Sequence, residues 1–169
     1  MTTLIQKKIC LLGDFSVGKT SLIERFVYNR FSERYLSTIG VKISRKVITI
    51  SSDITLNILI WDLAGSEEFT GVQSNYLQGA KGAIFVCDLT RPETLSSLGA
   101  YKQQLELVVP GIPVILAGNK ADLKDKQKIS ETILEEEAQK LNTVAFTMTS
   151  AKTGRGVEDI FKILAEELI

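Results

Sequence analysis

The sequence contains no histidine, and this absence excludes several kinds of chemistry at once. The chain has no imidazole to act as a general base, to assist a nucleophile or to bind zinc. Proton transfer therefore has to use carboxylates, backbone groups or water. An excess of charge of one sign is also missing, because 20 Lys and Arg balance 20 Asp and Glu. Without surplus positive charge to attract nucleic acid or anionic lipid, any phosphate ligand must be held by local contacts.

Cysteine is scarce, and long apolar runs are absent. Cys10 and Cys87 lie far apart in apolar runs without a CxxC spacing, so we interpret them as buried free thiols of a reducing compartment. No apolar run approaches the length of a membrane span, and residues 1–8 lack the features of a signal peptide. The chain ends without a cysteine, so we expect no prenyl anchor in this sequence. These absences predict a cytoplasmic protein.

What the chain does have is the composition and the pattern of one globular domain. Its 169 residues, 44% hydrophobic and 24% charged, suffice for one sizeable core, so we expect a single domain over residues 1–169. Short apolar runs alternate with amphipathic segments, as is typical of parallel strands buried on both faces and joined by helices. The runs lie at 8–12, 56–61, 82–87, 113–117 and 144–148.

Between these runs, apolar residues at helical spacing predict helices over 95–108, 134–141 and 157–164. Thr90 and Ser130 are the expected helix starts. Residues 41–50 alternate between apolar and polar and then turn directly into the next strand, so we expect an antiparallel hairpin at one sheet edge. The pattern predicts an α/β domain with helices on both faces and a ligand site at the carboxyl ends of the strands.

A phosphate-binding motif follows the first predicted strand directly. It reads Gly13-Asp14-Phe15-Ser16-Val17-Gly18-Lys19-Thr20, which fits GxxxxGK[ST], and it leads into an expected helix over 21–28. In this order the glycines let backbone N–H groups surround a β-phosphate, Lys19 reaches the β and γ oxygens, and the Thr20 hydroxyl binds Mg²⁺. An accidental glycine turn of this form is rare, and rarer still between a strand and a helix. The motif predicts nucleotide phosphate binding.

A second motif, Asp62-Leu63-Ala64-Gly65, stands at the end of another predicted strand. There the Asp62 carboxylate can hold a water of the Mg²⁺, and the Gly65 N–H can meet a γ-phosphate. DxxG by itself often arises by chance, so its weight comes from its position.

Two further segments can read a purine base. Asn119-Lys120-Ala121-Asp122 follows the run at 113–117. A carboxylate at Asp122 only accepts, which suits guanine N1–H and its 2-amino group, whereas adenine has an acceptor at N1 and no 2-amino group. Ser150-Ala151-Lys152, after the last predicted strand, can add a backbone N–H toward guanine O6. The alternative is a capped turn, which Asn and Asp readily form; the order of the motifs after a P-loop disfavours it.

In these motifs the chain resembles the Ras superfamily of small GTPases over essentially its whole length, and within it the Rab branch. The Rab likeness lies in Thr38-Ile39-Gly40-Val41, Ile60-Trp61-Asp62-Leu63-Ala64-Gly65, Tyr76-Leu77-Gln78-Gly79-Ala80 and Asp88-Leu89-Thr90. The resemblance implies a three-layer P-loop NTPase fold, the G domain, with a six-stranded, mostly parallel sheet, one antiparallel edge strand and two switches that sense the γ-phosphate. It also implies GTP or GDP with Mg²⁺ as ligands, and effectors, exchange factors and activating proteins as partners.

Carried over residue by residue, the resemblance implies a complete nucleotide site. The nucleotide-binding positions are Gly13, Asp14, Phe15, Ser16, Val17, Gly18, Lys19, Thr20, Ser21, Phe31, Tyr35, Thr38, Gly65, Asn119, Lys120, Asp122, Ser150, Ala151 and Lys152. Phe31 matches the aromatic residue that packs beside guanine. The implied metal-site residues are Thr20, Thr38 and Asp62, and the residues implied in hydrolysis are Lys19, Thr38, Gly65 and Ser66.

Two departures from the family pattern concern hydrolysis. Most relatives carry a glutamine after DxxG to orient the attacking water, but this chain has Ser66, whose hydroxyl is too short to take over. Glu67 or Glu68 would be repelled by the γ-phosphate. Phe15 stands where relatives often carry a small residue, and its ring would crowd an incoming arginine finger. We therefore predict slow intrinsic hydrolysis; neutral local variation at both positions is the alternative.

Two functions stay open from the sequence. One is a GTP/GDP switch with weak hydrolysis, which the state-sensing residues Thr38 and Gly65 favour. The other is a constitutively GTP-bound interaction module, which Ser66 favours. A P-loop ATPase or small-molecule kinase is disfavoured by Asp122, which does not suit adenine.

A hydrophobic patch gives a hypothesis about partners. Ile43, Trp61 and Tyr76 fall where Rab-like proteins contact effectors, with Ile43 in place of the usual aromatic residue. Large apolar residues also build ordinary cores, so an effector patch and a core position have equal weight at this point.

Overall fold

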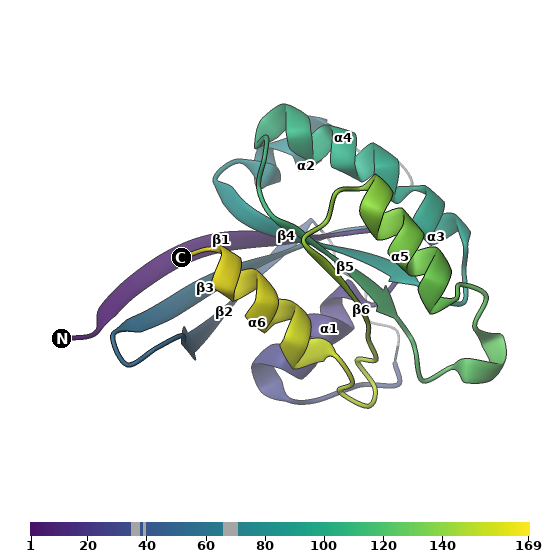
Figure 1. Ribbon diagram of the computed structural model, residues 1–169, viewed down its shortest axis with the longest axis horizontal. Coiled ribbons are helices and arrows are strands. Elements are labelled where there is room, and N and C mark those ends of the chain that lie inside the picture. Colours follow the sequence, from purple (N-terminus) through teal and green to yellow (C-terminus); the bar gives the residue numbers. More distant parts are fainter. Residues whose placement is uncertain (35–37, 39, 66–70) are drawn as a thin grey trace.

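Six strands form one sheet in the order β2-β3-β1-β4-β5-β6, and helices cover both of its faces (Figure 1). The computed structural model describes residues 1–34, 38, 40–65 and 71–169. The strands are β1 (Thr3–Leu12), β2 (Val41–Thr49), β3 (Ile54–Leu63), β4 (Ala80–Asp88), β5 (Val114–Asn119) and β6 (Ala145–Met148). The predicted α/β fold with a six-stranded sheet is confirmed.

The edge of the sheet has the predicted hairpin. β2 runs antiparallel to β3, whereas all other neighbouring strands are parallel. β1 and β3 are longer than their apolar runs, because the ladder between them continues as far as the Thr3–Ile54 pair. Backbone hydrogen bonds extend these strands through polar residues that hydropathy alone does not mark as strand.

Two layers of helices enclose the sheet. On one face lie α1 (Lys19–Tyr28) and α6 (Val157–Glu167), and on the other lie α2 (Gly71–Leu77), α3 (Glu93–Ser96), α4 (Leu98–Val108) and α5 (Glu131–Lys140) (Figure 1). A 3₁₀ turn, η1 (Lys124–Lys126), follows β5. None of the helices in the described part of the chain is long and apolar enough to cross a membrane.

The apolar runs continue through the strands because alternate residues enter two separate cores. Ile9 and Leu11 of β1 belong to the core under α1 and α6, where the rings of Phe26 and Phe161 stack 3.9 Å apart. Cys10 enters the opposite core, and so does Cys87 of β4. Both thiols are free and buried, as predicted, and burial raises the pKa of each to about 12.

One predicted helix start is confirmed and the other is wrong. The Ser130 hydroxyl caps α5 by accepting from the Ile133 N–H at 3.2 Å. Thr90 caps no helix, because its N–H and hydroxyl both donate to Asp88 Oδ1, at 2.8 and 2.6 Å. The helix begins two residues after Arg91, and the predicted segment 95–108 is divided at Ser97 into α3 and α4.

Candidate nucleotide-binding site

A cavity of about 360 Å³ opens at the carboxyl ends of the strands and brings the predicted motifs together. This volume is in the usual range for small-molecule sites. Of the predicted positions, it is lined by Phe15, Ser16, Gly18, Lys19, Thr20, Ser21, Phe31, Thr38, Gly65, Asn119, Lys120, Asp122, Ala151 and Lys152. The sequence did not single out Ser32, Glu33, Arg34, Leu63 and Leu123, which line it as neighbours of predicted residues.

The other predicted residues either do not line the cavity or lie outside the described residues. Gly13, Asp14, Val17, Asp62 and Ser150 are not among the lining residues, and the contacts below give them supporting roles. Tyr35 and Ser66 lie outside the described residues, as do Glu67 and Glu68.

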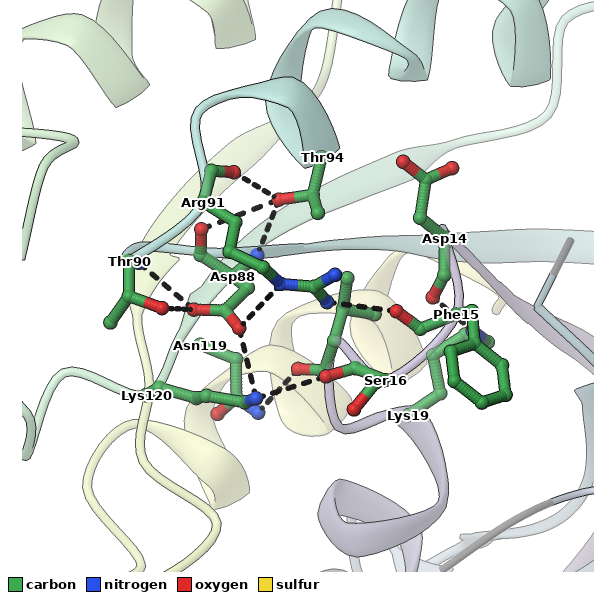
Figure 2. Close-up of polar contacts among 11 residues, drawn as sticks. Asp14, Phe15, Ser16, Lys19, Asp88, Thr90, Arg91, Thr94, Asn119 and Lys120 are labelled. Carbon is green, nitrogen blue, oxygen red and sulfur yellow. Dashed lines mark hydrogen bonds and ion pairs between the residues drawn. The ribbon is translucent and has the colours of Figure 1, made fainter. Parts of the chain in front are cut away.

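Every carbonyl of the P-loop from Gly13 to Val17 accepts a hydrogen bond from a side chain. Figure 2 shows the contacts to Phe15 and Ser16. The donors are Lys19 Nζ to Gly13 O (2.8 Å) and Asp14 O (3.0 Å), Arg91 Nη2 to Phe15 O (2.8 Å), Lys120 Nζ to Ser16 O (2.9 Å) and Asn119 Nδ2 to Val17 O (2.9 Å). The C=O and N–H of one peptide point in opposite directions. With its carbonyls held by these donors, the loop has its amides available for an anion.

Two glycines allow the close approaches on which the loop depends. Gly18 has φ +103°, and a Cβ there would overlap the side-chain amide of Asn119. At Gly65, a Cβ would lie 2.6 Å from the backbone nitrogen of Phe15. Only glycine fits at these places, so the DxxG segment packs backbone to backbone against the P-loop, and the Asn119 side chain at the end of β5 packs against the backbone of Gly18.

The carboxylate of Asp88, at the end of β4, supports the loop from behind (Figure 2). Asp88 is 1% exposed and accepts from Arg91 Nε at 3.1 Å and from Lys120 Nζ at 2.9 Å. Burial by itself would raise the pKa of Asp88, but hydrogen bonds from Thr90 and Lys120 bring it below the usual value. The ionised Asp88 carboxylate therefore positions Arg91 and Lys120, which donate to the carbonyls of Phe15 and Ser16.

Sequence reasoning missed this support. In the sequence, Asp88 belongs only to a segment of Rab likeness, and no motif marks Arg91 as a site residue. A carboxylate at the end of a strand that neighbours the P-loop strand was the available signal.

Asp14 anchors the loop to α4 with its side chain. Its carboxylate accepts from Ser97 Oγ at 2.7 Å and from Tyr101 Oη at 3.0 Å. The predicted nucleotide position at Asp14 is therefore filled by a residue whose side chain is engaged with the helix rather than the cavity.

Lys19 is the buried cation of the site. It is 6% exposed, and burial lowers the pKa of its ammonium to about 8 although Asp62 and Asp14 oppose the shift. An anionic phosphate against the ammonium would favour its charged form. The arrangement is suited to a phosphate ligand.

Three oxygen side chains gather beside Lys19. The Thr20 hydroxyl donates to Asp62 Oδ2 at 2.5 Å and lies 2.6 Å from the Thr38 hydroxyl, which is 3.1 Å from the same carboxylate oxygen. The other oxygen, Asp62 Oδ1, is buried and has no hydrogen-bond partner among the residues that the structure describes, and burial raises the pKa of the carboxyl. Hydroxyl and carboxylate oxygens are the ligands that Mg²⁺ prefers, so this set fits Mg²⁺.

A Mg²⁺ site of this kind does not need a cluster of carboxylates. The described part of the chain has no cluster of three His, Cys, Asp or Glu residues suited to a metal. Mg²⁺ commonly keeps waters and uses substrate phosphates together with few protein ligands.

At the other end of the cavity, Asn119 joins two loops. Its Nδ2 donates to Val17 O, and its Oδ1 accepts from Thr149 Oγ1 at 3.1 Å. This side chain is predicted to read a purine edge. Its oxygen and one amide hydrogen instead form hydrogen bonds that join the P-loop to the loop after β6. Asp122 stays at the cavity wall, where Ser150 Oγ donates to its Oδ1 at 2.8 Å.

Glu24 of α1 contacts one residue before Thr38 in the sequence and one after it. Its nearly buried carboxylate accepts from Arg30 Nε at 2.5 Å and from Lys42 Nζ at 2.9 Å. Burial would raise the pKa of Glu24, but these two donors lower it below the usual value. Arg30 and Lys42 are thus held to the helix that begins with Lys19.

The predicted hydrophobic patch is divided between surface and core. Ile43 on β2 is 51% exposed. Trp61, opposite it on β3, and Tyr76 are half-buried against the core under α2 and α4, with ring centroids 6.3 Å apart. The Lys8 ammonium lies 3.6 Å from the centre of the Trp61 ring. One side of the patch therefore faces solvent and the other belongs to the core.

Comparison with known proteins gives consistent matches along the chain. The Ras family model matches residues 8–169. GTP-binding protein ypt1 from Schizosaccharomyces pombe is 35% identical over 162 residues, which cover 95% of this chain and 79% of that protein. Ras-related protein RABF2a from Arabidopsis thaliana is 39% identical and Ras-related protein Rab5 from Nicotiana tabacum 38% identical, each over 165 residues covering 97% of this chain and 82% of the relative.

Proposed function

The chain belongs to the Ras family, and we propose that it is a Mg²⁺-dependent switch that binds GTP and GDP, hydrolyses GTP slowly and acts on effectors in its GTP-bound state. The observation that carries the proposal is the P-loop itself, whose carbonyls from Gly13 to Val17 are all held by side chains. An anion-binding loop of this kind, next to Asp122 in one cavity, suits a nucleotide with a guanine base.

In this proposal each end of the cavity has its own task. The P-loop amides and Lys19 bind the β- and γ-phosphates, and Thr20, Thr38 and Asp62 hold Mg²⁺, the last through a water. A Mg²⁺ held by these residues would supply positive charge against the charge that develops on the phosphate oxygens. Thr38 and the Gly65 N–H sense the γ-phosphate, so the switches that contain them differ between the GTP-bound and GDP-bound states.

At the base end, the Asp122 carboxylate accepts from N1–H and the 2-amino group of guanine. The Ala151 N–H donates to O6. Phe31, which lines the cavity, packs beside the base.

The nucleotide that the purified protein carries tests this function. We expect about one GDP or GTP per chain and no adenine nucleotide, because guanine alone matches Asp122. Quantitative chromatography of nucleotides released by denaturation measures this. Removal of Mg²⁺ with EDTA should speed nucleotide release. An adenine nucleotide in the site, or release that EDTA does not change, would contradict the proposal.

Hydrolysis by this chain is expected to be slow. Without a glutamine at Ser66, the remaining groups stabilise charge but do not position the water. The basal rate should be at or below about 10⁻⁴ per second, the level of an unassisted small GTPase. Single-turnover phosphate release at saturating Mg²⁺ measures it.

Two substitutions test the two expected causes of slow hydrolysis separately. Ser66→Gln should raise the hydrolysis rate if the new amide reaches the attacking water. Adding Phe15→Gly should raise the rate further if the Phe15 ring crowds the site. The effects of the two substitutions would then be coupled rather than additive. Ser66→Ala is the matched control, because it removes the hydroxyl without adding an amide. A fast wild-type rate, or one that neither substitution changes, would show that another residue positions the water.

The competing function is a constitutively GTP-bound interaction module. Negligible release of phosphate, with and without candidate activating proteins, would favour it. In either case we propose that effectors meet the switches and the exposed side of the patch at Ile43. The location in the cell stays a prediction.

A further inference from the structure

An arginine in the last turn of α1 ties the loop after β6 to that helix. Arg25 Nε donates to the Ala151 carbonyl at 2.8 Å, and Arg25 Nη2 donates to the Lys152 carbonyl at 2.6 Å. The remaining nitrogen, Nη1, donates to Asn29 Oδ1 at 3.2 Å. Arg25 and Ala151 are 126 residues apart in sequence, so no local pattern links them.

The chemistry of these contacts requires arginine. A guanidinium presents several N–H donors in one rigid plane, so it can hold two successive carbonyls at once, whereas an ammonium is a point charge. Both carbonyls turn toward α1. The Ala151 N–H belongs to the preceding peptide, whose Ser150 carbonyl accepts from the Gly154 N–H, so Arg25 fixes the place of the Ala151 residue and the loop contact orients its N–H.

Other contacts give the loop its internal shape. The Ser150 carbonyl accepts from the Gly154 N–H at 2.8 Å, and the Ser150 N–H donates to Arg155 O at 2.9 Å. These contacts stay within the loop. Arg25 fixes where the loop lies relative to α1, the helix that begins with Lys19 and Thr20.

We propose that Arg25 is a specificity-determining positioning residue: by holding the Ala151 and Lys152 carbonyls, it keeps the Ala151 N–H within reach of the 6-oxo group of guanine. Ala151 is buried and lines the cavity, so a small displacement of its backbone changes a contact with the base rather than with solvent. The inference rests on the proposed function, in which the Ala151 N–H donates to O6.

Two analogues of GDP separate this contact from the rest of the site. 6-Thio-GDP keeps N1–H and the 2-amino group but has sulfur, a weak acceptor, in place of O6. IDP keeps the 6-oxo group and lacks the 2-amino group that Asp122 accepts from. Equilibrium affinities for GDP, 6-thio-GDP and IDP are measured for wild type, Arg25→Ala, Arg25→Lys and Asn29→Gly.

Wild type should prefer GDP to 6-thio-GDP by about tenfold, the worth of one well-placed hydrogen bond. Arg25→Ala should bring this ratio close to one, and Arg25→Lys should leave about a threefold preference, since lysine lacks the fork. The ratio of GDP to IDP affinity should stay at its wild-type value in both. Asn29→Gly is the matched control: it removes the third acceptor, tolerates the positive φ of 52° at this position, and should match wild type.

Each other result has a definite meaning. An unchanged ratio of GDP to 6-thio-GDP in Arg25→Ala would overturn the inference, and so would an equal fall in both ratios, which indicates a generally loosened site. A wild type without preference for GDP over 6-thio-GDP would contradict the proposed O6 contact itself. Circular dichroism checks the fold, and Arg25→Lys carries the test should Arg25→Ala fail to fold.

Discussion

Replacing Asp122 with asparagine is expected to lower the affinity for GDP about a thousandfold and to create a preference for xanthine nucleotides. The substitution keeps the shape and the Ser150 contact, because Oδ1 remains an acceptor. It replaces a charged acceptor of two hydrogen bonds with an amide whose N–H₂ faces guanine donors. Xanthine has a carbonyl at C2 that accepts from this amide. Competition between GDP and XDP for the nucleotide-free protein measures the change.

Asp125→Asn is the matched control for this prediction. Asp125 lies exposed in η1, outside the cavity, and its replacement removes the same charge. Wild-type guanine affinity is expected in that variant, together with a wild-type preference for GTP over ATP of about 10⁴-fold, as for a site whose polar groups an analogue leaves unpaired. Unchanged GDP binding by Asp122→Asn would refute the assigned base contact.

Replacing Lys19 with alanine is expected to reduce the affinity for Mg²⁺·GDP by about a thousandfold or more. In the proposed site the ammonium is the buried cation opposite the phosphates, and removing one member of such a buried pair costs about 3–5 kcal/mol. Its loss also takes the donor from the carbonyls of Gly13 and Asp14, which frees the loop to turn. Titration with a fluorescent GDP analogue measures the affinity.

Lys126→Ala serves as the control here, since Lys126 is exposed in η1 and does not line the cavity. A circular dichroism spectrum matching wild type shows that Lys19→Ala is folded. Tight binding of Mg²⁺·GDP by folded Lys19→Ala would mean that the phosphates do not lie on this P-loop.

The elements that could be predicted from the sequence are those whose causes lie close together along the chain. The Ser130 cap needs only an amide three residues away, and the P-loop needs only its glycines, its lysine and the change from strand to helix. The hairpin at the sheet edge follows from a turn too short for a crossover. The predicted base-reading segment is local in the same way, because Asn119 ends a buried strand and Asp122 follows three residues later.

Thr90 shows where local reasoning stops. Its residue type and its place before Arg91 and Pro92 are those of a helix cap, yet the carboxylate of Asp88 takes its donors. That carboxylate is ionised although buried because Lys120 comes to it from the end of β5, in addition to Arg91 three residues further along. A tertiary ion pair outweighed a local preference.

By itself the sequence determined which chemical groups stand at the site and on which end of the sheet they lie. Only the tertiary structure decided which side chains hold the backbone in place: Arg91 on the Phe15 carbonyl, 76 residues away, and Arg25 on the Ala151 carbonyl, 126 residues away. Backbone carbonyls are identical in every residue, so no pattern of residue types specifies which one an arginine will meet. That choice is made when packing brings two distant segments together and places a backbone carbonyl within reach of a side-chain donor.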